Sequence, residues 1–519
     1  MRLAILLVLS ATLLCEEERP FNVLFVGGGS RGDVQPLVAL ASYLRSAYGV
    51  DCTLVAGPEF EDLSRSVGCK SANLHLNFED VISTNSELHE ALTDQDVFKM
   101  MKVFGEIVKD PDHLGAKLIA KVMEENIFDA VVATSLEWHT PLTINEKYGL
   151  PGFTVVLQAN YFDPYQLAAI FDPAIFSTDP VEDYWVTFQK VWGAFSKHQM
   201  INSINPGRKE IFELERSLTP LESFAIMNGQ HPAVETLNAF SKHVVKPSDC
   251  VKVNLHGYLY QPIMSNDHTW FGVADDMVVF FESGPAPVYI GWGSMCCGLD
   301  NTPRITKAAI GALKQAGKRG IILKGWQRLS LESIADDEDL YEYAKKNVYF
   351  VDRAAHNWIL PRCEAVMVHG GAGTTAAAIR SGRPIIVSPY LADQPWWGAR
   401  IVNMGVGEMI SNLVSVTAEE LGAAIQRVTT NETMKEKARE VREHIEEENG
   451  VETMGQIIMG AMKQYREEGK KEVDLSVLDN IDLSWIGLEI NEEYLSAEAL
   501  ATPLFAEERT DNDDDDDDD

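Results

Sequence analysis

The chain has little positive charge. Its 519 residues include 44 Lys and Arg against 78 Asp and Glu, which gives a formal net charge of −34. Seven consecutive aspartates at positions 513–519 end the sequence. Because such a surface repels a phosphate backbone and no cluster of basic residues compensates, we expect no nucleic-acid partner.

The sequence also lacks an apolar run long enough to span a membrane. The N-terminal run at positions 3–15 follows Met1 and Arg2 and is too short for a spanning helix. It fits the apolar part of a secretory signal, although Leu13 and Cys15 match the cleavage pattern poorly. Residues 1–20 are predicted to be a signal peptide or an anchor, with a plain extension as the alternative. The expected location is the lumen of the secretory pathway, or a membrane-associated one, and otherwise the cytoplasm.

Cysteine is scarce and scattered. The seven cysteines show no spacing typical of metal ligands, and we expect no disulfide scaffold. The adjacent pair Cys296-Cys297 follows an expected strand and is interpreted as packing. The sequence therefore predicts no metal site.

Short apolar runs alternate with amphipathic segments in two series. Strands are expected at residues 22–26, 52–56, 130–134, 152–156, 288–291, 320–323, 348–351, 365–368 and 384–388. Helices are expected between them, including residues 36–48 and 58–67. This order is typical of parallel sheets covered on both faces. The predicted fold class is α/β, with two doubly wound, Rossmann-like domains facing across a cleft, which is the default ligand site.

Turn-rich and acidic segments set the predicted boundaries. An N-terminal domain is assigned to residues 21–255, a linker to 256–286 and a C-terminal domain to 287–470. Residues 471–519 are acidic, poor in apolar side chains and predicted to be disordered. This tail is interpreted as a solvated segment, with weak Ca²⁺ binding as the alternative.

The first glycine-rich turn is Gly27-Gly28-Gly29-Ser30-Arg31-Gly32-Asp33-Val34-Gln35-Pro36. Its glycine spacing differs from that of a dinucleotide-binding loop, whose last glycine would open the helix. Pro36 suits the first turn of the helix that follows. A carboxylate at the mouth of a cleft can accept a proton from a hydroxyl group, so Asp33 is a candidate general base. Capping of this helix is the alternative role for Asp33.

A second glycine-rich turn is Val368-His369-Gly370-Gly371-Ala372-Gly373-Thr374-Thr375-Ala376-Ala377. Its glycines permit close approach of a ligand, and a helix beginning near Thr374 would direct N–H groups and a positive dipole end at phosphate. Asp393-Gln394 follows about 20 residues later, a distance at which an acidic residue commonly meets sugar hydroxyls. The order predicts a nucleotide-sugar site.

At these residues the sequence resembles a known family. The turn from Gly29 to Pro36 is similar to the N-terminal signature of the UDP-glucose:sterol glucosyltransferases and the related antibiotic aglycone glycosyltransferases. Further similar stretches follow in the family's order at residues 246–249, 256–258, 287–295, 323–326, 352–358 and 369–400. The resemblance implies the GT-B arrangement, with the donor bound mainly by the second domain and the acceptor by the first.

The resemblance also implies roles for individual residues. Asp33 would be the catalytic base, and His369 would contact the donor diphosphate. The other implied donor-binding residues are Ser30, Gly293, Ser294, Trp326, His356, Trp358, Gly371, Gly373, Thr374, Asp393 and Gln394. The UDP-sugar, in the first place UDP-glucose, is a substrate, and neither a cofactor nor an essential metal is expected.

The sequence departs from the family at Val368, Ala392 and Cys250, where His, Gly and Trp are usual, and the fungal members' lipid-binding N-terminal domains do not occur in it. These departures concern the acceptor and the location more than the chemistry. The expected reaction is inverting transfer of a hexose to a hydroxyl of a sterol or other lipophilic acceptor, with peripheral membrane contact left open. A polyketide or a lipid alcohol is the alternative acceptor. The aromatic residues that would line its pocket, or belong to the core, are Trp138, Phe153, Tyr161, Phe162 and Trp192.

Two hypotheses belong to other functional classes. A dinucleotide-dependent oxidoreductase would explain the first glycine-rich turn but leaves Asp393-Gln394 unexplained. A non-enzymatic, acidic luminal Ca²⁺-binding protein would explain the tail and the signal but leaves the whole motif series unexplained.

Overall fold

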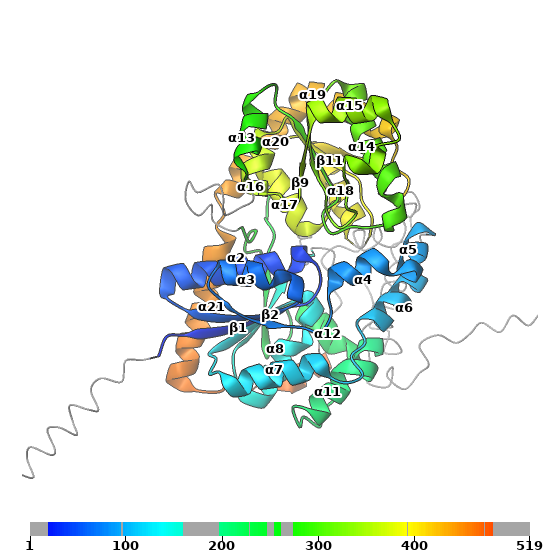
Figure 1. The fold of residues 1–519 in the computed structure, drawn as a ribbon. Helices are drawn as coiled ribbons and strands as arrows, with labels where there is room; N and C mark the ends of the chain where they lie inside the picture. The colour runs from blue at the N-terminus through cyan, green and yellow to red at the C-terminus, as the bar shows by residue number, and fades with distance from the viewer. Residues whose placement is uncertain are drawn as a thin grey trace, which may run out of the picture.

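The computed structural model describes residues 19–94, 97–158, 197–227, 229–245, 254–260, 273–391, 393–471 and 473–480. These residues form two lobes, each built on a six-stranded sheet (Figure 1). Several predictions lie outside the described residues: the signal up to residue 18, the linker stretch 246–249, the tail beyond residue 480, Ala392, Tyr161, Phe162 and Trp192.

The N-terminal sheet is parallel throughout, in the order β3-β2-β1-β4-β5-β6. Its strands are β1 (Asn22–Gly27), β2 (Asp51–Ala56), β3 (Lys70–Asn73), β4 (Ala130–Thr134), β5 (Gly152–Val156) and β6 (Val234–Asn238). The helices of this lobe are α2 (Arg31–Tyr48), α3 (Glu61–Ser66), α4 (Phe78–Thr84), α5 (Ser86–Thr93), α6 (Val97–Ile107), α7 (Leu114–Glu125), α8 (His139–Tyr148), α11 (Asn205–Glu210) and α12 (Pro220–Met227).

The C-terminal sheet is also parallel and has the order β12-β11-β10-β7-β8-β9. Its strands are β7 (Val288–Gly291), β8 (Gly320–Leu323), β9 (Val348–Val351), β10 (Ala365–Val368), β11 (Ile385–Val387) and β12 (Gly407–Met409). Its helices are α13 (Asp275–Glu282), α14 (Thr302–Ala316), α15 (Glu338–Asn347), α16 (His356–Ile359), α17 (Ala372–Arg380), α18 (Gln394–Asn403), α19 (Ala418–Thr430) and α20 (Glu432–Glu446). Counted from β7, its strands repeat the winding order of the first sheet. Each sheet therefore reverses its winding between two central strands, β1 and β4 in one lobe and β7 and β10 in the other.

Both faces of the N-terminal sheet are buried, as a parallel sheet requires. Along β1, Val23 and Phe25 belong to one apolar cluster, while Leu24 and Val26 belong to another on the opposite face, because successive strand side chains alternate. The first cluster includes residues of α2, and the second includes residues of α7 and α8. The carboxyl end of β1, which leads into the first glycine-rich turn, is thus held by packing on both faces of the sheet.

The last long helix, α21 (Gly450–Glu468), packs on the N-terminal lobe. Its Met454, Ile458 and Met462 are buried in the same cluster as α2, and Figure 1 shows it in orange along that lobe. The range 287–470 predicted for the C-terminal domain therefore includes one helix that the structure places on the other lobe.

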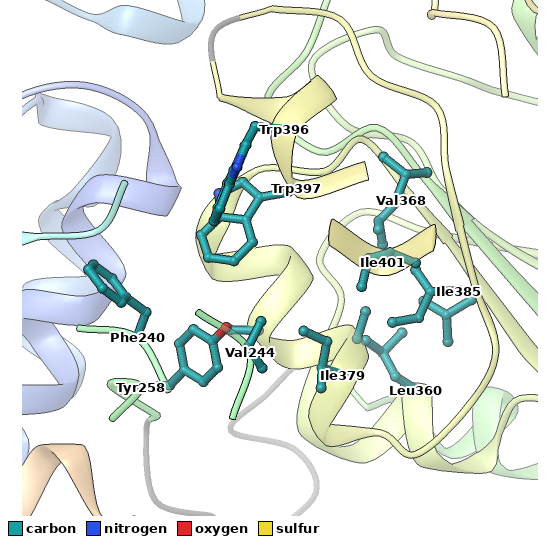
Figure 2. Packing of buried hydrophobic residues seen from close by; sticks show 14 of the residues in the cluster. Phe240, Val244, Tyr258, Leu360, Val368, Ile379, Ile385, Trp396, Trp397 and Ile401 are labelled. Carbon is teal, nitrogen blue, oxygen red and sulfur yellow. The ribbon is translucent and has the colours of Figure 1, made fainter. Parts of the chain in front are cut away.

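One apolar cluster joins the lobes. It combines Phe240 and Tyr258, which follow β6, with Trp397 of α18 (Figure 2). Beside it, Nε of Arg400 in α18 donates to the carbonyl of Val244 at 2.6 Å. The two lobes thus form a continuous packed contact beneath the cleft that their sheet edges border.

All nine strands expected from the sequence are present, some with ends shifted by one residue. Three strands were not foreseen: β3, β6 and β12. The expected start of the first helix at Pro36 was wrong, because α2 begins at Arg31 and Pro36 lies inside it. Ser30 caps the helix and starts it earlier, and Pro36 without an N–H leaves the carbonyl of Gly32 free of a helical partner.

Cys52 in β2 and Cys69 before β3 form a disulfide, while Cys296, Cys297 and Cys363 are buried thiols. One bridge within a sheet is not a scaffold, but no spacing of the cysteines indicated it. No helix in the described part of the chain is both long and apolar enough to cross a membrane.

Candidate functional site

The predicted site residues gather at the carboxyl ends of the central strands. The turn with Ser30 and Asp33 follows β1, and the turns with Gly293 and His369 follow β7 and β10. These are the positions at which the winding of each sheet reverses, where neighbouring connections diverge and leave room for a ligand. The fold itself therefore places both glycine-rich turns at the same cleft.

Asp33 lies in the first turn of α2 and completes its cap. Ser30 donates to Asp33 Oδ2 through its backbone nitrogen at 2.8 Å and its hydroxyl at 3.2 Å. Gly29, with a φ of 106°, permits this arrangement, since a Cβ there would lie 2.5 Å from Asp33 Oδ2. Burial raises the pKa of Asp33 to about 6, and hydrogen bonds from Ser30 oppose that rise. The capping role proposed as an alternative is real, and it leaves Oδ1 without a hydrogen bond from any described residue.

Glu137 is a second carboxylate at this edge that the sequence analysis missed. It follows β4, and its Oε1 would lie 2.5 Å from a Cβ at Gly28. Its Oε2 lies 3.6 Å from Nε2 of His139, and burial raises the pKa of Glu137 to about 7. The signal that could have found it is its position directly after a central strand. Trp138 between them is a core residue, as is Phe153, so neither lines an open pocket.

The second glycine-rich turn is shaped as an anion site. Gly371 is the N-cap of α17 and provides no side-chain cap, so the first N–H groups of that helix lack a capping partner. His369 is 7% exposed, and its Nδ1 has no hydrogen-bond partner among the described residues. A Cβ at Gly371 would lie 2.5 Å from His369 Nε2, which explains a glycine there. Burial lowers the pKa of His369 to about 4, so its imidazole is neutral at pH 7 and can donate one N–H.

Gly293 and Ser294 lie opposite this turn. A Cβ at Gly293, whose φ is 60°, would lie 3.2 Å from Cε1 of His369. The carbonyl of Gly293 accepts from the backbone nitrogen of Trp326 at 3.0 Å, which holds the loop after β8 against the same site. Ser294, Trp326 and Thr374 are half-buried, and Gly373 is exposed. The structure thus brings predicted donor-binding residues of three loops together.

Asp393 and Gln394 differ in the hydrogen bonds that their side chains already make. Asp393 is 8% exposed and accepts from Nε1 of Trp397 at 2.8 Å. Burial raises its pKa to about 7, and the charge of Asp33 raises it further. Oε1 of Gln394 instead accepts from the backbone nitrogens of Tyr390 and Leu391 at 2.7 and 3.1 Å. Asp393 therefore faces the other lobe's carboxylate, whereas the amide oxygen of Gln394 shapes its own loop.

His356 and Trp358 share the short helix α16 but have different surroundings. Nε2 of His356 is 3.1 Å from the hydroxyl of Tyr289, and the pKa of His356 is lowered to about 3 by burial, with Arg31 and His369 adding to the effect. His356 is therefore part of the cleft. The Trp358 ring packs edge-on against Phe281, and the Arg362 guanidinium lies over it. The donor-binding role of Trp358 stays a prediction.

The two lobes face each other at the N-termini of two helices. Figure 1 shows α2 directly beneath α17, and a Cβ at Gly373 would lie 3.8 Å from the carbonyl oxygen of Gly32. A carboxylate from one lobe and a phosphate-type anion site from the other thus border one cleft. Such an arrangement can deprotonate a hydroxyl and stabilise a departing diphosphate. Among the described residues, no group of three His, Cys, Asp or Glu side chains is arranged to hold a metal ion.

Comparison with known families finds a match in each lobe. Residues 23–164 match the glycosyltransferase family 28 N-terminal domain, and residues 333–457 match the erythromycin biosynthesis protein CIII-like C-terminal domain. Among solved structures, the glycotransferase of kitacinnamycin superposes with a TM-score of 0.55 at 15% identity, covering 86% of this chain and 100% of that one. The glycosyltransferase VinC in complex with DTDP superposes with a TM-score of 0.53 at 17% identity, again covering 86% and 100%. The GT-B fold class predicted from the sequence is confirmed.

Characterised relatives cover most of the chain. A sterol 3-beta-glucosyltransferase of Arabidopsis thaliana is 27% identical over 448 residues, which are 82% of this chain and 65% of the relative. A second one from the same plant is 27% identical over 83% of this chain and 64% of its own length. The vancomycin aglycone glucosyltransferase of Amycolatopsis orientalis is 26% identical over 79% of this chain and 91% of its own. The chain thus spans slightly less than two thirds of the length of these plant relatives, and the predicted family resemblance is confirmed.

Proposed function

We propose that this chain, which has the GT-B fold, transfers a hexose from a UDP-sugar, with UDP-glucose as the first candidate, to a hydroxyl of a lipophilic acceptor. The observation that carries this proposal is the pairing across the cleft of Asp33 with the anion site around His369 and Gly371. Asp33 and His369 come from different lobes, as a reaction between two substrates requires.

Each part of the site has a task in this reaction. Oδ1 of Asp33 accepts the proton of the acceptor hydroxyl as that oxygen attacks the anomeric carbon. The bond from the anomeric carbon to the diphosphate oxygen breaks on the opposite face, so one displacement inverts the centre. The N–H groups at the start of α17 and the imidazole of His369 donate hydrogen bonds to the departing diphosphate and stabilise its charge. No metal ion is needed in this mechanism.

A sterol is the first candidate for the acceptor. The support is the similarity to the two Arabidopsis thaliana proteins, which are named for this acceptor. The vancomycin aglycone glucosyltransferase covers a comparable share of the chain, and it supports a non-sterol acceptor as the alternative.

We also propose that the protein works in the secretory pathway lumen or at a membrane facing it. The apolar N-terminal run and the Cys52–Cys69 disulfide support this location, because disulfides persist in oxidising compartments.

Ligand-induced stabilisation tests the donor. UDP should raise the melting temperature of the purified protein, and NAD should not, because a ligand that binds only the folded state stabilises it. Stabilisation by NAD without any by UDP would overturn the transferase proposal in favour of an oxidoreductase.

A further inference from the structure

The first turn of α2 carries a cation with no anionic partner. Nε of Arg31 donates to Oε1 of Gln35 at 3.0 Å, and no carboxylate of the described residues pairs with the guanidinium. The carboxylate nearest in sequence, Asp33, is held by Ser30 instead. In a protein with a net charge of −34, a half-buried arginine without a carboxylate needs an explanation.

The charge of Arg31 affects titratable groups of the opposite lobe. Its charge influences Tyr289, His356 and Arg353, all of which belong to the C-terminal lobe. Burial lowers the pKa of Arg31, and the charge of Arg353 lowers it further. Arg353 is exposed and also has no ion pair among the described residues, while its neighbour Asp352 pairs with Lys324 at 2.9 Å. The charge of Arg353 thus bears on Arg31 from the opposite lobe, and an anion bound at Arg31 would relieve this unfavourable interaction.

Further hydrogen-bond donors, from His369 and the N-terminus of α17, lie near Arg31. His356 is influenced by both Arg31 and His369, which ties the arginine to the loop that follows β10. The His369 side chain is 7% exposed, and its Nδ1 lacks a hydrogen-bond partner within the described part of the chain. The N-terminus of α17 faces the turn that begins with Arg31, since a Cβ at Gly373 would lie 3.8 Å from the carbonyl oxygen of Gly32. The unpaired arginine therefore borders the anion site from the other lobe.

We propose that Arg31 binds the diphosphate of the donor across the cleft, opposite the N-terminus of α17; this inference rests on the proposed function. A guanidinium presents a planar fork that fits two phosphate oxygens at once, and a diphosphate carries more negative charge than a monophosphate, so diphosphate binding should depend more strongly on Arg31. Arg31 and Asp33 share one helical turn. A diphosphate held by Arg31 therefore also fixes the proposed base beside the anomeric carbon, which makes Arg31 a donor-binding residue that positions Asp33.

Calorimetric titration of the full chain with UDP, UMP and inorganic pyrophosphate tests this role. Arg31→Gln should weaken binding of UDP and of pyrophosphate about 10- to 100-fold, the range for a lost charge-assisted hydrogen bond, and should change UMP binding much less. Arg31→Lys should restore part of the loss because it keeps the charge. The matched control is Arg45→Gln, which removes the same charge from the last turn of the same helix, where Arg45 pairs with Asp51 at 3.5 Å.

Each outcome separates this inference from the proposed function. Arg31→Gln binding UDP and pyrophosphate as tightly as Arg45→Gln does would overturn the role of Arg31 and leave the proposed function standing. A native protein that binds pyrophosphate in an Arg31-dependent way but not UDP would reject the proposed function and keep the anion site. A native protein that binds neither would reject both. Equal melting temperatures of the three variants exclude misfolding as the cause of any loss.

Discussion

The Asp33 carboxylate completes the capping box of α2 and, in the proposed reaction, also accepts the proton of the acceptor hydroxyl. Only Oδ2 receives the hydrogen bonds from Ser30, so the cap and the proton transfer use different oxygens. This division explains how a residue of a capping box can also be a base. It also means that the two roles can be separated by one substitution.

Asp33→Asn keeps a side-chain oxygen that can accept from the backbone nitrogen of the N-cap Ser30, but it removes the proton acceptor. Turnover of UDP-glucose should fall roughly 10²- to 10⁴-fold, the range for a positioned general base. UDP affinity should change little, because most donor contacts lie in the other lobe. Steady-state rates and UDP titration of the purified variant measure both quantities, and near-native turnover would reduce Asp33 to a helix cap.

The pH dependence of kcat/KM reports the same carboxylate. Because burial raises the pKa of Asp33 to about 6 and the base acts in its ionised form, kcat/KM should decline as the pH falls through about 6. Burial, with the charge of Asp33 adding to it, raises the pKa of Asp393 to about 7, so Asp393 is largely protonated while Asp33 ionises. Asp393→Asn should therefore leave the midpoint of this decline near pH 6, even if it lowers the rate. A midpoint that moves well below about 6 in the variant would show that Asp393 is ionised before Asp33.

Sequence reasoning found those site residues that sit in glycine-rich turns and missed those defined by tertiary contact. Asp33, His369 and Gly371 lie where strand, turn and helix signals coincide, so their place at the cleft follows from local pattern. Arg31 lies in the first glycine-rich turn and Glu137 directly follows a central strand, but the local pattern does not single out either side chain, because its importance comes from what the other lobe or the next strand brings near it.

At the level of elements, strands were predictable where the sequence is a continuous apolar run. Such runs are buried in β1 and β4 and mostly half-buried in the edge strand β9. In contrast, β3 reads Lys-Ser-Ala-Asn and is largely exposed, and β12 is a three-residue edge strand. Edge strands need fewer apolar residues, so an apolar pattern does not detect them.

Helix α21 is held to the N-terminal lobe by a charge cluster that no sequence pattern revealed. Asp129, whose side chain is fully buried, accepts from Arg19 at 2.8 Å, from Arg466 of α21 at 2.8 and 2.9 Å, and from the backbone nitrogen of Asn22 at 2.8 Å. Burial alone would raise the pKa of Asp129, but the hydrogen bonds from Arg466 and Arg19 outweigh it and lower the pKa. The cluster therefore stabilises the fold above the ordinary Asp pKa and loses that contribution as the pH falls below it.

Asp129→Asn should destabilise the protein by about 2–4 kcal/mol, because two arginines lose a buried charged partner. The comparison is Asp62→Asn, which breaks a surface pair with Arg65 at 3.1 Å and should cost no more than about 0.5 kcal/mol. Thermal unfolding of both variants measures the difference. Equal melting temperatures would show that α21 is held by its apolar face alone.

At the scale of the whole molecule, two lobes with the same winding order present their switch points to one cleft. The negative charge is spread over both, and carboxylates also border the cleft, but Arg31 and the N-termini of α2 and α17 provide a local site for an anion. An acidic protein with a local anion site is suited to a small anionic substrate and unsuited to a polyanion.

The disulfide gives a test of the proposed location. In protein recovered from its native cell under conditions that block thiols, peptides containing Cys52 and Cys69 should remain linked, whereas Cys296, Cys297 and Cys363 should be alkylated only after unfolding. Peptide mapping by mass spectrometry reads both. Reduced Cys52 and Cys69 in freshly isolated protein would place the chain in a reducing compartment.

Product analysis tests glycosyl transfer most directly. The purified chain is incubated with UDP-glucose and a sterol or a lipid extract, with the Asp33→Asn variant as the matched control, and the products are examined by mass spectrometry and NMR. The predicted result is release of UDP together with an acceptor that has gained one hexose in the β configuration, and a much smaller yield with Asp33→Asn. An α-linked product would contradict the single displacement, and UDP-glucose left intact with every acceptor would contradict glycosyl transfer itself.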